Sequence, residues 1–155
     1  MYYMFNNLLY RIYKPLHHNV EYSKINNTLM GLLSVHTPGE LDSKNELVLE
    51  DRELWSNVNC IFYIPTKQRV YKNYLNKEIQ EKIIKSKDPF ELLESKFNKT
   101  DIKLVNLTPV LTKKAEKKLK EDKLLYFKDD THWNKEGILA VLPEVNKCIN
   151  RNLPL

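Results

Sequence analysis

The chain has 155 residues, a formal net charge of +5, 42% hydrophobic and 29% charged residues, which is typical of one soluble globular domain with a real core. Only three glycines are present, so phosphate-binding loops of the P-loop and dinucleotide types are excluded. Residues 1–58 carry a charge of −2 and residues 59–155 carry +7. The lysines of residues 113–123 fit a solvated helix face better than a nucleic-acid interface, so we expect no nucleic-acid partner.

Residues 1–19 are rich in aromatic side chains but have no basic leader and no cleavage site, so they do not resemble a signal peptide. They are also too short and polar to span a membrane. We interpret them as a short helix that covers the core, and docking to a partner stays open. Residues 20–45 show no clear pattern. Ser34 lies between Leu33 and Val35, which are too bulky for the sharp turn of a nucleophile.

The pattern sharpens after residue 58. Residues 60–64 form a continuous apolar run that predicts a buried strand, and Pro65 ends it. Lys67 and Tyr71 follow on a loop or the next turn, where a lysine is usually solvated. Cys60 and Cys148 are most simply buried reduced thiols, although a bridge between them is possible.

Three further elements follow in order. Asp88 and Pro89 predict a helix start, and Asn98 can end that helix. Residues 102–107 read as a second strand. Thr108 and Pro109 repeat the combination of a cap and a proline before a lysine-rich helix.

The last part of the chain predicts a third strand at residues 124–127 and a final helix capped by Asn134. Pro143 lies inside this helix and should kink or restart it. Strands that alternate with helices indicate an α/β fold with a parallel sheet. Right-handed crossovers would bring the loops at residues 65–67 and 130–132 to the same edge of that sheet.

Asp130 and His132 lie two residues apart on the predicted strand-to-helix loop. A carboxylate on Nδ1 fixes the tautomer of an imidazole and leaves Nε2 free to accept a proton from a hydroxyl. Trp133 could exclude water or stack on a sugar ring. The same pair could be a plain surface loop or two metal ligands, but the other histidines are distant and no cysteine pair has zinc spacing. We therefore expect no metal and no cofactor.

Two sequence blocks carry a resemblance to a known family. Residues 126–137 read YFKDDTHWNKEG, and residues 61–75 read IFYIPTKQRVYKNYL. Both resemble blocks of the SGNH-hydrolase-like domains of the AlgX/AlgJ family of polysaccharide O-acetyltransferases, over about residues 58 to 150.

The resemblance implies a three-layer parallel sheet flanked by helices, SGNH- or flavodoxin-like and incomplete, over residues 46–155, with an uncertain segment at residues 1–45. It implies that Asp130 orients His132 as general base, and that Trp133, Lys67 and Tyr71 bind substrate. It also implies the periplasm or cell envelope, although the chain shows no signal peptide and the cytoplasm is the alternative. The family's nucleophilic serine follows downstream on a Gly-x-Ser turn, whereas no serine follows Gly137 here.

Two functional hypotheses result. In the first, the chain supplies the Asp–His half of a triad for acetyl transfer to or from carbohydrate hydroxyls and is inactive alone. In the second, it is a truncated or degenerate module that binds a polysaccharide or a protein partner without chemistry. An incomplete sheet would leave an edge uncovered, so self-association is a further expectation.

Overall fold

The computed structural model describes residues 20–26, 28–33, 58–86, 88–128 and 130–150. The expected helix at residues 1–19 and Ser34 lie outside this part of the chain. The described elements, in chain order, are β1 (Val20–Ile25), β2 (Thr28–Leu33), β3 (Cys60–Tyr63), α3 (Lys67–Val70), the 3-10 helix η2 (Lys72–Tyr74), α4 (Lys77–Lys85), α5 (Pro89–Phe97), β4 (Lys103–Asn106), α6 (Thr108–Leu119) and α7 (Lys135–Asn150).

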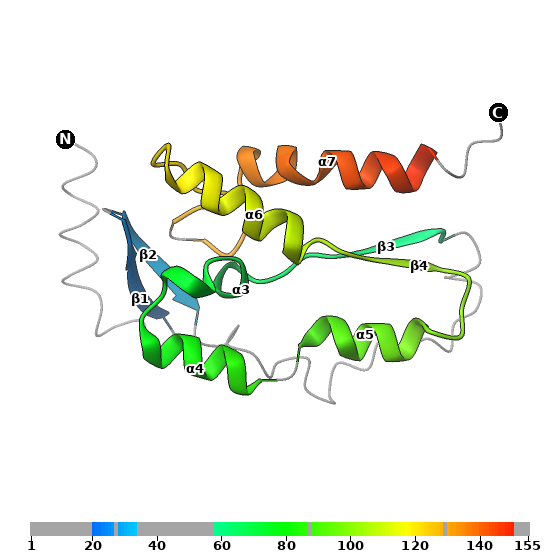
Figure 1. Cartoon of the computed structure of the whole chain (residues 1–155), viewed down its shortest axis with the longest axis horizontal. Coiled ribbons are helices and arrows are strands. Elements are labelled where there is room, and N and C mark those ends of the chain that lie inside the picture. The colour runs from blue at the N-terminus through cyan, green and yellow to red at the C-terminus, as the bar shows by residue number, and fades with distance from the viewer. Residues whose placement is uncertain (1–19, 27, 34–57, 87, 129, 151–155) are drawn as a thin grey trace.

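The two predicted central strands pair as expected. β3 and β4 are parallel, with Cys60 opposite Lys103 and Tyr63 opposite Asn106. α7 packs against β3, α5 packs against β4, and the two helices lie on opposite sides of the strand pair (Figure 1). Helices around a small parallel sheet make this an α/β fold.

The predicted third strand is wrong. Residues 124–127 add no strand to β3 and β4, and their only ladder contact is an isolated antiparallel bridge between Tyr126 and Trp133. The apolar run is still buried, because Leu125 and Tyr126 are 0% and 2% exposed. Burial therefore accounts for the apolar residues at positions 125 and 126, but their backbone pairs with the end of the following loop, at Trp133, and not with β3 or β4.

The helix ends follow the sequence signals with one exception. The Asp88 side chain accepts a hydrogen bond from the Phe90 amide at 3.0 Å, and Asn98 ends α5, both as predicted. Thr108 does not cap α6: it is the first helical residue, and the carboxamide oxygen of Asn106 accepts from its amide at 2.9 Å instead. α7 runs continuously through Pro143, so the helix does not restart there, and the kink that was the other expectation stays a prediction.

An antiparallel hairpin, β1 and β2, occupies a region where the sequence showed no pattern. Ile25 pairs with Thr28 across a two-residue turn, and Asn26 adopts a positive φ of 52°, which asparagine tolerates. The Asn26 side chain also donates to the carbonyl of Leu119 at 3.0 Å, at the end of α6. The Leu119 carbonyl also accepts from the amide of Asp122 at 3.1 Å, so the Asn26 side chain adds a second donor to a carbonyl at the end of the helix.

One main core holds the described elements together. The hairpin contributes Ile25, Met30 and Leu32 to the same buried cluster as α4, α6 and the residues before α7. A smaller cluster of Tyr63, Leu93 and Phe97 lies between the strands and α5. The hairpin therefore packs in the same core as the later elements of the chain.

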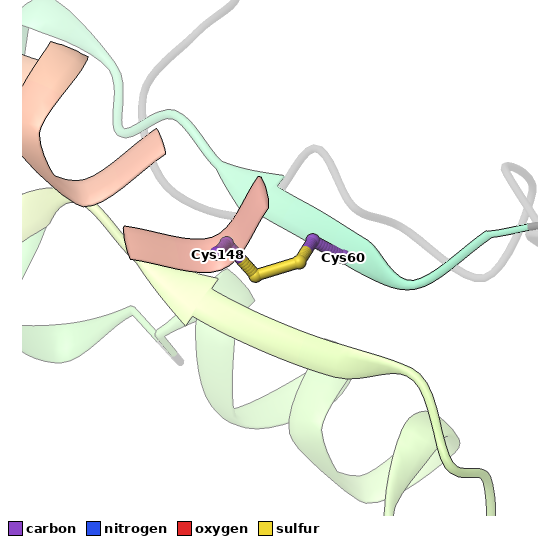
Figure 2. The surroundings of a disulfide bond; sticks show 2 residues. All are labelled: Cys60 and Cys148. Carbon is purple, nitrogen blue, oxygen red and sulfur yellow. A yellow bond between two sulfur atoms is a disulfide. The ribbon is translucent and has the colours of Figure 1, made fainter. Parts of the chain in front are cut away.

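The cysteines form a disulfide, so the expectation of two reduced thiols is wrong. Cys60 of β3 is bonded to Cys148 near the end of α7, and their Cα atoms are 6.6 Å apart (Figure 2). The bond joins residues 88 positions apart. It fixes the C-terminal part of α7 to the strand against which α7 packs.

Within the described residues, no helix is long and apolar enough to cross a bilayer.

Candidate active site

The loop that carries Asp130 and His132 is closed at its base by backbone hydrogen bonds. The amide of Phe127 donates to the carbonyl of His132 at 3.1 Å, and the amide of Asn134 donates to the carbonyl of Leu125 at 2.8 Å. The Asn134 side chain donates to the carbonyl of Leu124 at 2.8 Å and accepts from the amides of Glu136 and Gly137. Asn134 is thus the predicted cap of α7 and also holds the segment before the loop.

Gly137 is required by a close approach at the start of α7. A Cβ atom at this position would collide with the carbonyl oxygen of Leu125 and lie 2.9 Å from the Cβ of Trp133. Because the Leu125 carbonyl accepts from Asn134, the backbone cannot give way without loosening the loop. The glycine that ends the Asp-x-His-Trp-Asn-x-x-Gly pattern therefore has a packing role.

Asp130 and His132 form the predicted pair. Nδ1 of His132 lies 2.6 Å from Oδ1 of Asp130, and the same oxygen accepts from the backbone amide of His132 at 3.1 Å. With Nδ1 protonated toward the carboxylate, Nε2 carries the lone pair. Nε2 has no hydrogen-bond partner in the described part of the chain, and the His132 side chain is 76% exposed. The ring is therefore oriented from one side and accessible from the other.

The contact with His132 lowers the pKa of Asp130 below its ordinary value of 3.8. The hydrogen bond from the imidazole is the largest cause, followed by the hydrogen bond from the backbone amide of His132. A carboxyl group with a lowered pKa stabilises the folded loop above its unfolded pKa, and this contribution is lost as the pH falls through the folded pKa. Because both side chains are exposed, the stabilisation applies to the loop and is screened by salt.

We expect His132→Ala to raise the pKa of Asp130 toward 3.8, because the principal hydrogen bond is lost. The measurement is a titration of the carboxyl carbon of Asp130 by NMR, in the wild-type chain and in the variant. Thr131→Ala serves as the control, because the Thr131 hydroxyl lies 3.4 Å from Asp130 and makes only a weak contact. Equal pKa values for Asp130 in the wild type and His132→Ala would contradict the pairing.

A pocket of about 260 Å³ opens beside the imidazole. Its walls come from the segment after β3 and from the Asp130–His132 loop; the lining residues are Ile64, Pro65, Thr66, Lys67, Gln68, Tyr126, Thr131, His132 and Trp133. The predicted meeting of the loops at residues 65–67 and 130–132 is therefore confirmed, although no third strand carries the second loop. No serine is among the lining residues that the structure describes.

Trp133 lines the pocket next to His132, where the sequence placed it. Lys67 lines it too, but the expectation of a solvated lysine is wrong. Lys67 is 2% exposed, and its ammonium donates to the carbonyls of Phe127 at 2.8 Å and Lys128 at 3.3 Å. A carboxylate on a substrate would have to displace these contacts, so the geometry does not favour Lys67 as a substrate ligand.

Tyr71 is completely buried and does not line the pocket. Its hydroxyl accepts from the amide of Leu125 at 2.7 Å, and its ring packs edge-on against Tyr126, with centroids 6.3 Å apart. Burial raises the pKa of Tyr71 to about 12, so the hydroxyl stays protonated at neutral pH. This position does not favour the predicted contact of Tyr71 with substrate, because a ligand cannot reach the side chain.

Tyr126 is a pocket residue that the sequence analysis did not identify, and its partner Pro65 belongs to the predicted loop at residues 65–67. The hydroxyl of Tyr126 donates to the carbonyl of Pro65 at 2.7 Å, and burial raises the pKa of Tyr126 far above its ordinary value. Tyr126 thus joins the two walls as a neutral donor. Its position directly before the Asp130–His132 loop could have indicated a role at the site, but no sequence pattern links it to a carbonyl 61 residues away.

Among the described residues, no group of three potential metal ligands occurs.

A family model described as "SGNH hydrolase-like domain, acetyltransferase AlgX" matches residues 57–155, more than half of the chain. This range contains both walls of the pocket and the Asp130–His132 pair. No curated protein and no solved structure matches the chain.

Proposed function

The chain belongs to the SGNH hydrolase-like, acetyltransferase AlgX family, and on this premise we propose that it contributes to O-acetyl transfer to or from carbohydrate hydroxyls. In this proposal His132 is the general base and Asp130 the carboxylate that orients it. The 2.6 Å contact between Nδ1 and Oδ1, with Nε2 accessible beside a pocket, is the observation that carries the proposal.

The direction of proton transfer follows from this geometry. Nε2 would take the proton of an attacking hydroxyl as its oxygen bonds to the acetyl carbonyl carbon, and Asp130 would stabilise the resulting imidazolium. The same proton would then pass to the departing oxygen. Because no serine lines the pocket among the described residues, the nucleophilic hydroxyl in this proposal comes from outside them.

The pocket suits one sugar residue or an acetylated sugar edge. Its volume lies slightly below the range of pockets for drug-sized ligands, which begins at about 300 Å³. Trp133 offers an aromatic face for the C–H groups of a sugar ring, and Thr66 and Thr131 offer polar atoms. We assign Trp133 to substrate binding, and we assign Lys67 and Tyr71 to the support of the pocket walls.

The disulfide supports a location outside the cytoplasm, because such bonds persist in oxidising compartments. The family match agrees with a periplasmic or cell-envelope role. We also propose that the β3–β4 pair is part of a larger three-layer sheet, as the SGNH-like class implies. Exposed edges of that pair would then be covered by further strands or by a partner.

We expect neutral and acetylated oligosaccharides to shift the NMR signals of the Trp133 indole and the His132 ring, because both line the pocket. The measurement is a titration of the labelled chain with both types of oligosaccharide. Trp133→Ala should abolish the shift at His132, whereas Tyr74→Ala, which removes an exposed ring that does not line the pocket, should retain it.

The alternative function, a module that binds carbohydrate without chemistry, predicts the same shifts. It is separated from the enzyme by the ester assay described in the Discussion and by whether a serine-bearing segment or partner restores turnover. If no oligosaccharide shifted the Trp133 signal, carbohydrate binding in this pocket would be contradicted for both candidate functions.

A further inference from the structure

The segments at residues 65–67 and 126–128 are joined by two side chains that run in opposite directions. Tyr126 donates its hydroxyl to the carbonyl of Pro65 at 2.7 Å. Lys67 donates its ammonium to the carbonyls of Phe127 and Lys128 at 2.8 and 3.3 Å. These contacts connect the two walls of the pocket directly beneath the Asp130–His132 loop.

We propose that Lys67 is a positioning residue, whose buried ammonium fixes the start of the Asp130–His132 loop and thereby the direction of the imidazole. The inference rests on the proposed function, because it gives Lys67 a role in the same site. It replaces the substrate contact expected from the sequence with an indirect one.

Phe127 is the residue through which Lys67 acts. Its carbonyl accepts from Lys67, and its amide donates to the carbonyl of His132 at 3.1 Å. The carbonyl of Phe127 thus accepts from Lys67, while its amide closes the turn that carries His132. A change at Lys67 is therefore transmitted to His132 through a backbone hydrogen bond.

The burial of Lys67 explains why this support is specific. An ammonium that is only 2% exposed has lost most of its water and must be compensated by acceptors. Carbonyl oxygens at residues 127 and 128 contribute to that compensation when the loop is in its observed place. Displacement of the loop would leave a charge without these acceptors, so the position of the loop is tied to the lysine.

The ammonium of Lys67 is directed to the backbone of the loop, although Lys67 lines the pocket. Among the lining residues that the structure describes, Lys67 is the only lysine or arginine, and its ammonium donates to backbone carbonyls. Asp130, which holds His132 from the other side, does not line the pocket. The two charged side chains thus orient the imidazole, while Thr66 and Thr131 are neutral polar residues of the lining.

The test compares Lys67→Met with the wild type by amide hydrogen exchange and by NMR of the His132 ring nitrogens. We expect the exchange of the Phe127 and His132 amides to rise by about tenfold or more relative to Leu111, because a hydrogen bond to a charged group commonly contributes that much. Leu111 reports on the main core, where its amide donates to Leu107 at 3.0 Å. The Nδ1-protonated form of His132 should decrease in the same variant.

Lys103→Met is the matched control, because Lys103 is an exposed lysine on β4. It should leave the loop amides and the His132 signals unchanged. A merely structural role for Lys67 would raise the exchange of Leu111 and the loop amides together, without a selective effect on His132. Equal changes at all these amides would overturn the proposal.

A second measurement needs no variant. In the wild type, the ammonium protons of Lys67 should exchange slowly enough to be observed by NMR at neutral pH, while those of Lys103 should not. Loss of this difference would overturn the proposal even when Lys67→Met fails to fold. Rapid exchange of the Lys67 ammonium would contradict the positioning role without affecting the proposed function of the Asp130–His132 pair. An absence of oligosaccharide binding would contradict the proposed function without affecting the Lys67 result. The two failures are therefore distinguishable.

Discussion

The purified chain is expected to hydrolyse an activated acetyl ester, such as p-nitrophenyl acetate, no faster than its own His132→Ala variant. The reason is that His132 has an accessible Nε2 but no serine lines the pocket in the described part of the chain. Loss of the serine or the histidine of a triad lowers turnover on the order of a million-fold, so the remaining base contributes little. We expect the deficit here to be of that size.

The assay requires a control for imidazole itself, which attacks activated esters weakly. His36→Ala removes a different histidine of the chain and should give the same rate as the wild type and His132→Ala. Asp130→Asn should also leave this background unchanged, because a step that does not use the pair is insensitive to its orientation. All four proteins should thus hydrolyse the ester at one common rate.

Turnover that exceeds this background and depends on His132 would show that the chain contains its own nucleophile. Three serines outside the described residues, Ser34, Ser43 and Ser56, would then be replaced one at a time by alanine. Loss of turnover in one of these variants would identify the nucleophile and would end the hypothesis of a half triad.

The candidate site was more predictable than the sheet around it. The contact between Asp130 and His132 spans two residues, and the cap bonds of Asn134 span two and three, so a local pattern contains the information that places them. The third strand failed for a different reason. The carbonyls of Leu124, Leu125 and Tyr126, which a strand ladder would use, accept hydrogen bonds from Asn134. The same asparagine that was recognised as a helix cap therefore prevents the strand.

The contacts that close the pocket were not predictable from the sequence. Lys67 finds its acceptors about 60 residues away, and no periodicity distinguishes such a buried lysine from a solvated one. The hairpin at residues 20–33 was missed because a two-residue Asn–Asn turn is a weaker signal than Asn–Gly. The pairing of Cys60 with Cys148 spans 88 residues, and two cysteines alone do not reveal whether they meet.

The disulfide is expected to provide a large part of the stability of the fold. Cross-linking residues 88 positions apart removes conformational entropy from the unfolded chain worth about 4.5 kcal/mol at 25 °C. Reduction should therefore lower the free energy of unfolding by about that amount, and the melting temperature by roughly 10 to 15 °C. The measurement is urea and thermal denaturation with and without a thiol reductant.

The double variant Cys60→Ala, Cys148→Ala is the matched control. It should unfold as the reduced wild type does, and the reductant should not change it further. Its midpoint, compared with that of the reduced protein, also separates the loss of the cross-link from the loss of packing at Cys148, which is 2% exposed. Equal midpoints for the oxidised and reduced wild type would contradict a stabilising bond.

The same experiment separates stability from the site. The bond holds the C-terminal end of α7 to β3, whereas the Asp130–His132 loop is held by Asn134, Lys67 and the amide of Phe127. Below the lowered melting temperature, the reduced protein should therefore keep the hydrogen bond between Nδ1 of His132 and Asp130, with unchanged ring-nitrogen signals. A loss of that hydrogen bond in the folded, reduced protein would mean that α7 transmits strain to its own N-terminus, and the loop would then depend on the redox state of the compartment.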